Sequence, residues 1–172
     1  IGNYALSGCT SLTKFNSDID GEIDIPEEIT TLPSGVFAEC SSITKVNVPN
    51  TVTSIGSSAF YGCDSIEEIT LPFVGNTKGG TDNTHFSYIF GGLSSVPTSL
   101  KKVTITGGTI GGSAFENCSS LTSVTIGDSV TTIGNSAFYN CDSLTSITIP
   151  DSVTTIGEYA FYNCRSLTSI ML

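Results

Sequence analysis

Six cysteines are the residues of this chain with the widest chemical potential, because thiols form disulfides, bind metals and act as nucleophiles. A spacing of 23 residues separates Cys40 from Cys63, Cys118 from Cys141 and Cys141 from Cys164. If this period reflects stacked turns, the cysteines point the same way about 4.8 Å apart, whereas a disulfide needs converging Cβ atoms about 3.8 Å apart. The sequence has no C-x-x-C pair, and a single histidine cannot complete a zinc site of the usual spacing. We therefore predict a column of six buried, free thiols.

Catalytic chemistry has little support in the remaining residues. His85 is the only histidine, and the sequence contains no G-x-S-x-G, H-E-x-x-H or Walker motif. Pairs of carboxylates are present, but the sequence places no proton-transfer partner beside them. We predict that the chain is not an enzyme.

An acidic segment near the amino terminus could bind calcium. Residues 16–27, NSDIDGEIDIPE, have the length and oxygen spacing of an EF-hand loop. The candidate ligands, which flank Gly21, are Asn16, Asp18, Asp20, Asp24 and Glu27. The alternative, which we favour, is that Asp20-Gly21 between two extended segments forms a tight turn. Residues 16–24 are then a hairpin-like acidic insertion, and no other cofactor is predicted.

The cysteine spacing is part of a 23-residue repeat, and this repeat predicts where the residues discussed above lie in the fold. Counted from each cysteine, apolar residues recur at offsets 3, 6, 8, 12, 15, 19 and 20. One unit has Leu144, Ile147, Ile149, Val153, Ile156, Ala160 and Phe161 at these offsets. The L-x-x-I-x-I segment alternates as a half-buried strand does, and a turn-forming proline follows it in four units. Stacked turns must place these strands side by side in a parallel sheet. The predicted fold is a mainly β solenoid with short turns or 3-10 segments.

The whole chain, residues 1–172, is interpreted as one solenoid domain that begins and ends within a repeat, so we expect it to be part of a longer array. Besides residues 16–24, one long insertion breaks the period, at residues 73–96. In it, Phe86, Ile89 and Phe90 are predicted to fold inward and replace missing core positions. The alternative is a functional loop, and in either case Asp82, His85 and Tyr88 could contact a partner.

The repeat resembles that of a known family. The unit AFYNCDSLTSITIPDSVTTIG, from Ala137 to Gly157, is similar to the BspA-like leucine-rich repeats, which are named after a bacterial surface antigen. The resemblance covers residues 1–72 and 97–172. It implies a right-handed leucine-rich-repeat solenoid, without catalytic residues, in a secreted or cell-surface bacterial protein. It also implies adhesion to a host matrix or cell-surface protein or glycan.

Charge limits the range of partners. The chain has 16 acidic and 6 basic residues and a formal net charge of −10, which disfavours nucleic acid and anionic membranes. The sequence contains neither an apolar run of membrane-spanning length nor a signal peptide. We expect a monomer that does not insert into a membrane.

The exposed strand positions at offsets 4 and 5 are charged only in some turns. There, opposite charges are predicted to meet on adjacent strands, Lys45 with Glu68, and Glu67 and Glu68 with Lys101 and Lys102. Together with Asp82, His85 and Tyr88, these residues are the predicted binding epitope. Two alternatives remain: the charges only fix the register of the strands, or the chain is a structural stalk that displays another domain.

Overall fold

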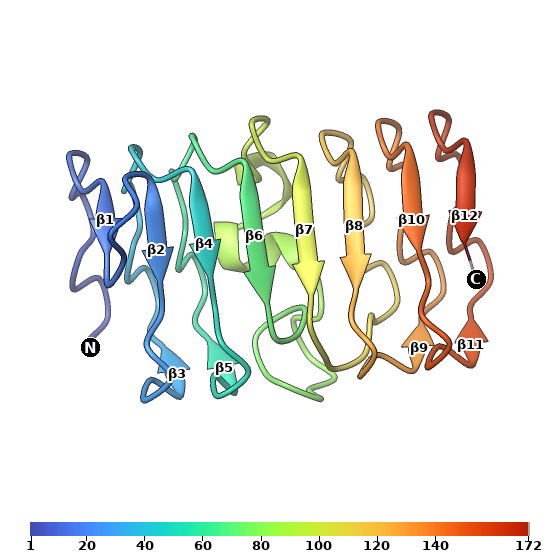
Figure 1. Cartoon of the computed structure of the whole chain (residues 1–172), viewed down its shortest axis with the longest axis horizontal. Helices are drawn as coiled ribbons and strands as arrows, with labels where there is room; N and C mark the ends of the chain where they lie inside the picture. Colours follow the sequence, from blue (N-terminus) through green and yellow to red (C-terminus); the bar gives the residue numbers. More distant parts are fainter. Residues whose placement is uncertain (172) are drawn as a thin grey trace.

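The computed structural model describes residues 1–171 and forms a solenoid in which successive turns lie side by side (Figure 1). One face is an eight-stranded parallel sheet in the order β1-β2-β4-β6-β7-β8-β10-β12. The strands are Lys14–Phe15 (β1), Glu22–Asp24 (β2), Lys45–Asn47 (β4), Glu68–Leu71 (β6), Lys102–Ile105 (β7), Ser123–Ile126 (β8), Ser146–Thr148 (β10) and Ser169–Met171 (β12). The hydrogen bonds between neighbouring strands lie along the long axis of the molecule (Figure 1). The predicted parallel β solenoid is confirmed.

A second, discontinuous set of short strands lines the other side of the turns. Thr31–Leu32 (β3) pairs with Ser54–Ile55 (β5), and Thr132–Ile133 (β9) pairs with Thr155–Ile156 (β11), both in parallel. Helical structure in the described residues is limited to two 3-10 segments, Phe86–Phe90 (η1) and Leu93–Ser95 (η2). Across residues 1–171, no helical segment has the length and hydropathy that a membrane crossing requires.

The core follows the predicted offsets and is held together by a column of phenylalanines. Phe37 and Phe60 stack with centroids 5.8 Å apart, and Phe115 and Phe138 with centroids 5.1 Å apart. Between these pairs, Phe90 lies 6.4 Å from Phe60, and the column continues through the insertion. Further members are Phe15, Phe86 and Phe161. Each ring therefore contacts the turn on either side, as apolar positions in a stacked interior should.

Two tight corners shape each turn around the Ala-Phe pair. Ser136 and Asn140, on either side of Ala137-Phe138, both have a positive φ, and the same two positions have a positive φ in neighbouring turns. Asparagine tolerates this conformation better than most residues. Its amide also connects the turns, because Asn140 Nδ2 donates to Asn117 Oδ1 at 2.9 Å. A short sequence thus forms two corners without a helix.

Close approach of the backbones explains the glycine that ends each T-x-I-G segment. A Cβ atom added at Gly134 would lie 2.6 Å from backbone atoms of Gly111 and Gly112 in the preceding turn. At Gly111 the nearest neighbour of an added Cβ would be the Thr84 side chain at 3.4 Å, because the insertion precedes this turn. The turns are therefore packed less tightly at their junction with the insertion.

The acidic insertion has a different structure from the predicted hairpin over residues 16–24. Strands β1 and β2 pair in parallel, Lys14 with Glu22 and Phe15 with Ile23. The chain returns through a short loop in which Asn16 and Gly21 have a positive φ. The hairpin prediction was wrong because β2 also pairs in parallel with β4. The insertion thus adds one extra strand to the sheet.

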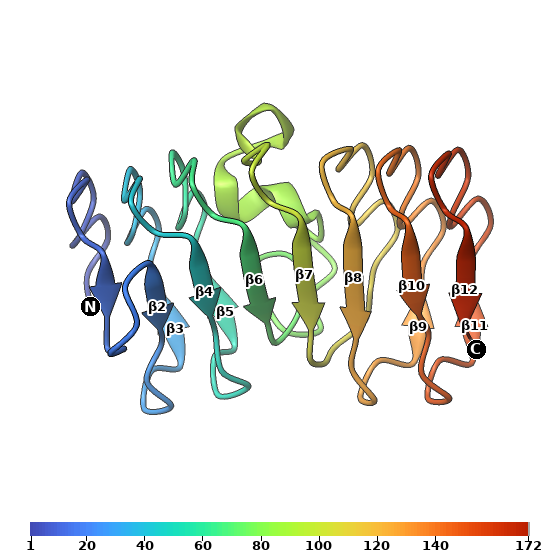
Figure 2. The same ribbon diagram turned by 45° about the horizontal axis from the view of Figure 1, so that its top comes forward.

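The long insertion, residues 73–96, takes the place of the back of a turn. Phe86 and Phe90 are fully buried and Ile89 is 1% exposed, which confirms that these residues fold inward. The backbone of η1 connects the flanking turns, because Phe60 N–H donates to the Ile89 carbonyl and Phe86 N–H donates to the Ala114 carbonyl. An antiparallel bridge between Ser54 and Thr77 joins the loop to β5. Figure 2 shows the coils of the insertion behind the eight-stranded sheet.

Candidate binding surface on the outer face of the sheet

The sheet has one exposed face, and a row of alternating charges crosses part of it. Residues at offset 5 of successive turns are register partners across the strands. From β1 to β7 this row consists of Lys14, Glu22, Lys45, Glu68 and Lys102. We call these five residues the charge ladder. Neighbouring side chains of opposite sign on adjacent strands attract one another, so the ladder favours this register.

Glu22 is the most buried member of the charge ladder, with 5% of its surface exposed. Its carboxylate accepts hydrogen bonds from Ser17 Oγ at 2.8 Å and Asn47 Nδ2 at 2.6 Å, and pairs with Lys45 Nζ at 3.1 Å. The hydrogen bond from Ser17 and the ion pair with Lys45 lower the pKa of Glu22. A buried carboxylate with this many partners fixes the orientation of the groups around it. The sequence-based pairing missed Glu22 because offset 5 counted from Cys9 is Lys14, although Glu22 lies 23 residues before Lys45.

The predicted charge pairs are only partly formed. Lys102 Nζ lies 2.8 Å from Glu68 Oε1, as predicted, and this contact raises the pKa of Lys102. Lys45 is the register partner of Glu68, but its ammonium pairs with Glu22 instead.

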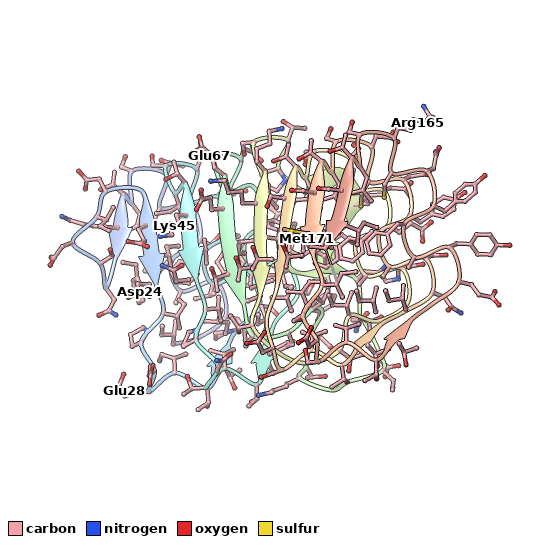
Figure 3. All side chains as sticks on the ribbon, turned by 45° about the vertical axis from the view of Figure 1, so that its right-hand side comes forward. Asp24, Glu28, Lys45, Glu67, Arg165 and Met171 are labelled. Carbon is pink, nitrogen blue, oxygen red and sulfur yellow. The ribbon has the colours of Figure 1, made fainter. Side chains whose placement is uncertain are left out.

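Lys101 and Glu67, at offset 4, precede the strands and lie at one end of the sheet. Lys101 Nζ donates to the carbonyls of Thr98 and Ser120, so the predicted pairing of Lys101 with Glu67 was wrong. Figure 3 shows Glu67 at the upper end of the sheet, well away from Asp24 at the lower end.

After β7 the outer face is uncharged. On β8 and β10 its outward positions are serine and threonine, such as Ser146 and Thr148, and on β12 the register partner of Thr148 is the exposed Met171. The threonine hydroxyls at offset 4 are used within the fold, since Thr145 Oγ1 donates to the Thr122 carbonyl and Thr168 Oγ1 to the Thr145 carbonyl. The charge ladder therefore ends at β7.

The predicted epitope in the insertion lies on another side of the molecule. Asp82 and His85 are exposed, and Tyr88 is half-buried against the core. They belong to the loop and to η1, which pass behind the sheet in both ribbon views (Figures 1 and 2). The charge ladder and residues 82–88 are therefore two separate surfaces, and the prediction of one joint epitope was wrong.

The structure does not bring the candidate calcium ligands together. Within residues 1–171, no three His, Cys, Asp or Glu side chains are close enough to hold a metal ion. Asp20 pairs with Lys14 at 3.8 Å, and Asn16 Nδ2 donates to the Asp24 carbonyl. Of the remaining candidates, Asp18 and Glu27 are exposed. Strand β2 occupies the middle of the segment, so an EF-hand loop is not formed.

The cysteines form the expected column with one exception. All six thiols are free, and Cys40, Cys63, Cys118 and Cys141 are buried. Burial raises the pKa of Cys40 to about 11 and that of Cys63 to about 12. Cys164 is half-buried and Cys9 is exposed, so the prediction that all six are buried was wrong for these two.

Sequence reasoning also missed a group of surface tyrosines. Tyr139 and Tyr162 stack with centroids 5.2 Å apart, and Tyr159 contacts Tyr162 edge-on at 5.8 Å. Tyr159 is 64% exposed and Tyr162 is 54% exposed. Tyrosine at the position after Ala-Phe, in the sequences AFYGC and AFYNC, was the available signal.

This architecture, with one strand per turn and a column of inward apolar residues, defines a leucine-rich-repeat solenoid. The chain matches the model of the BspA type leucine rich repeat region over residues 1–88 and 88–172. It therefore belongs to the BspA-type leucine-rich repeat family. Among proteins with curated descriptions, none is similar in sequence to this chain.

Several solved structures are similar to this chain. A leucine-rich cell surface protein from Faecalibacterium prausnitzii is 28% identical with a TM-score of 0.53, over 99% of this chain and 41% of that one. A leucine-rich repeat protein from Bacteroides ovatus is 23% identical with a TM-score of 0.49, over 99% and 57% of the two chains. The leucine-rich repeat protein of T. pallidum is 23% identical with a TM-score of 0.46, over 99% and 61%. The chain thus spans less than two thirds of the length of each of these relatives.

Proposed function

We propose that this chain is a binding module of a bacterial cell-surface or secreted protein, with an adhesive rather than a catalytic role. Its partner is a host matrix or cell-surface protein or glycan. The observation that carries the proposal is the outer face of the sheet, which no other segment of residues 1–171 covers (Figure 1). Side chains on this face differ between turns whose core residues are alike, and a solenoid can vary such positions without disturbing its packing.

The strands from β1 to β7 are the best candidates for contact with the partner. Every Lys–Glu pair of the charge ladder includes a side chain that is at least 40% exposed, such as Lys45 at 45% and Lys102 at 63%. Charged groups on an exposed rim accelerate and orient association more than they raise affinity. We therefore expect the ladder to steer a partner to this half of the sheet.

A structural stalk is the second candidate, and the turns from β8 to β12 support it. Their outer face is uncharged, and on β8 and β10 it carries serine and threonine in a regular array. Contact residues that dominate binding energy are usually aromatic or arginine. The uncharged strands therefore suit a spacer, which could display a binding region in another part of the same solenoid.

The test is an array of matrix proteins and glycans probed with the full chain and with two variants. The sheet variant is Glu68→Gln with Lys102→Gln, and the loop variant is Asp82→Asn with His85→Gln. All four side chains are exposed or half-exposed, so both variants should fold. Deletion of residues 76–88 would be a poor test, because it removes the buried Phe86.

Capture of a partner that weakens or slows only in the sheet variant supports the proposal. Loss only in the loop variant would move the site to the insertion and contradict a sheet-face site. Absence of any captured partner, with all proteins folded, would favour the stalk.

A further inference from the structure

A pocket of about 330 Å³ opens on the sheet side of the molecule, beyond the charge ladder. It lies at the carboxyl ends of β2 and β4, where Pro49 provides apolar surface and Thr106 from the turn of β7 closes one side. Small-ligand and side-chain pockets in proteins have volumes of about 300–1,000 Å³. The pocket is therefore large enough for one long side chain of a partner.

Three polar residues along one wall of the pocket are held in register by the sheet. Asp24 is the register partner of Asn47, and Asn47 is the register partner of Thr70. Because adjacent strands are about 4.8 Å apart, a carboxylate, an amide and a hydroxyl follow one another along this wall. Backbone pairing on both sides of Asn47 holds the middle of this row in place.

Hydrogen bonding fixes which atoms of this row are free. Asn47 Nδ2 donates to Glu22 Oε1 at 2.6 Å. Because a carboxylate only accepts hydrogen bonds, the amide nitrogen of Asn47 must face Glu22. Within residues 1–171 its Oδ1 atom takes part in no side-chain hydrogen bond, so it is available as an acceptor. The buried Glu22 thus makes Asn47 an acceptor toward a ligand, next to the carboxylate of Asp24.

The pocket has a negative charge that its surroundings do not neutralise. Asp24 and Glu27 both line it, both are exposed, and neither forms an ion pair within the described residues. Its lining includes no lysine or arginine. A second depression, of about 560 Å³, shares Asp24 and Glu27 and adds Glu28. Figure 3 shows Asp24 and Glu28 at the lower end of the sheet, below Lys45.

We propose that this pocket holds an arginine side chain of a protein partner. Guanidinium has five donors and no acceptor, so it fits two carboxylates and an amide oxygen that only accept. It can pair with a carboxylate through two parallel hydrogen bonds, and the arginine stem can pack on Pro49. A neutral sugar could bind the hydroxyls of this pocket, but it would leave the negative charge of Asp24 and Glu27 without a cationic partner. The inference rests on the proposed function, because it names the chemistry of the partner.

The test measures binding of a fluorescent seven-residue peptide of alternating arginine and glycine to the full chain by anisotropy. The site variant is Asp24→Asn with Glu27→Gln. The matched control is Asp128→Asn with Asp151→Asn, which removes equal charge at the positions equivalent to Glu27 in two later turns. Those turns have Thr125 and Thr148 where this one has Asp24. All four carboxylates are exposed, and none forms an ion pair within residues 1–171, so both variants should keep the melting temperature of the parent.

We expect the site variant to bind the arginine peptide about tenfold more weakly or worse, and the control to change binding less than about twofold. A peptide with glutamine in place of arginine should not bind. Equal weakening in both variants would overturn the inference, because only net charge would matter. So would absence of arginine-peptide binding, or preference for a neutral oligosaccharide measured by calorimetry.

The two proposals can fail separately. If the array captures a partner that the site variant binds as well as the parent does, the arginine pocket is wrong and the binding module stands. If the arginine peptide binds through Asp24 and Glu27 but the array captures nothing, the pocket stands and the adhesive role is not supported.

Discussion

The strands from β1 to β7 and the strands from β8 to β12 share one hydrophobic core but differ in their outer faces. On the amino-terminal side, from β1 to β7, Lys and Glu alternate along the charge ladder. On the carboxyl-terminal side, Ser123 and Ser146 occupy the same register positions. The phenylalanine column nevertheless passes through both, with Phe37 and Phe138 fully buried. The repeat therefore constrains the residue types at the inward positions, whereas the outward positions can vary and are available for binding.

The strongest test of the shared interior is Phe86→Ala. Phe86 is fully buried in the insertion and lies 4.9 Å from Phe115 and 5.4 Å from Phe90, so it connects the two sets of turns. We expect the substitution to reduce the free energy of unfolding by about 3–5 kcal/mol, measured with urea. The control, Phe161→Ala, removes a partly exposed ring and should cost less. An equal or larger loss in the control would mean that the column is not continuous through the insertion.

Glycine substitutions compare a regular junction between turns with the junction at the insertion. Gly134→Ala places a methyl group 2.6 Å from the preceding backbone, whereas in Gly111→Ala the nearest atom belongs to the Thr84 side chain at 3.4 Å. We expect Gly134→Ala to cost about 1–3 kcal/mol and Gly111→Ala less than about 1 kcal/mol. Thermal unfolding of the two variants measures the difference. Similar melting temperatures would show that the insertion packs as tightly as a regular turn.

Glu22 is a buried member of the charge ladder and Glu68 is a more exposed one. Their contributions to stability should therefore depend differently on pH. Because partners lower the pKa of Glu22 in the folded state, its contribution to stability is fully present above the ordinary glutamate pKa of 4.5 and is lost as the pH falls through the lowered pKa. We expect Glu22→Gln to cost about 1–3 kcal/mol at pH 7 and to reduce the loss of stability in acid. Glu68→Gln, on an exposed pair, should cost less than about 1 kcal/mol. Urea denaturation at pH 7 and pH 3 makes the comparison, and identical pH dependence of parent and Glu22→Gln would contradict it.

The smallest expected effect is a difference in thiol reactivity between the two ends of the cysteine column and its interior. In the native protein Cys9 should react rapidly with a thiol reagent at pH 8 and Cys164 more slowly, because they are exposed and half-buried. The four buried thiols should react only on unfolding, since burial raises the pKa of Cys118 to about 12, for example. The expected total after unfolding is six. Rapid native reaction of three or more thiols would show that the interior opens easily.

Much of the fold could be predicted from the sequence, because stacked turns require apolar residues at the same inward offsets in every repeat. Even the inward role of Phe86 and Phe90 could be predicted, since the core would otherwise lack two rings. The parallel pairing of β1 with β2 could not, because Asp20-Gly21 locally favours a hairpin and the competing pairing with β4 depends on a distant strand.

The candidate surface was predictable only in part. Offsets place Glu68 beside Lys102, and the structure pairs them. Offsets cannot show that Lys45 pairs with Glu22, because a side chain with two possible partners is positioned by its three-dimensional surroundings. Nor can they show that the insertion passes behind the sheet (Figure 2). The acceptor wall of Asp24 and Asn47 depends in turn on Glu22, so it too was visible only in the folded chain.

The direction of the hydrogen bonds between turns also has a mechanical consequence. They lie along the long axis, so a force that pulls the two ends of the molecule apart acts on the turns in series. Turns should then peel off one at a time instead of shearing together. Each regular turn that opens releases 23 residues, which can extend to about 80 Å. Under tension the chain would lengthen in steps, and each step would limit the force that is transmitted between its two ends.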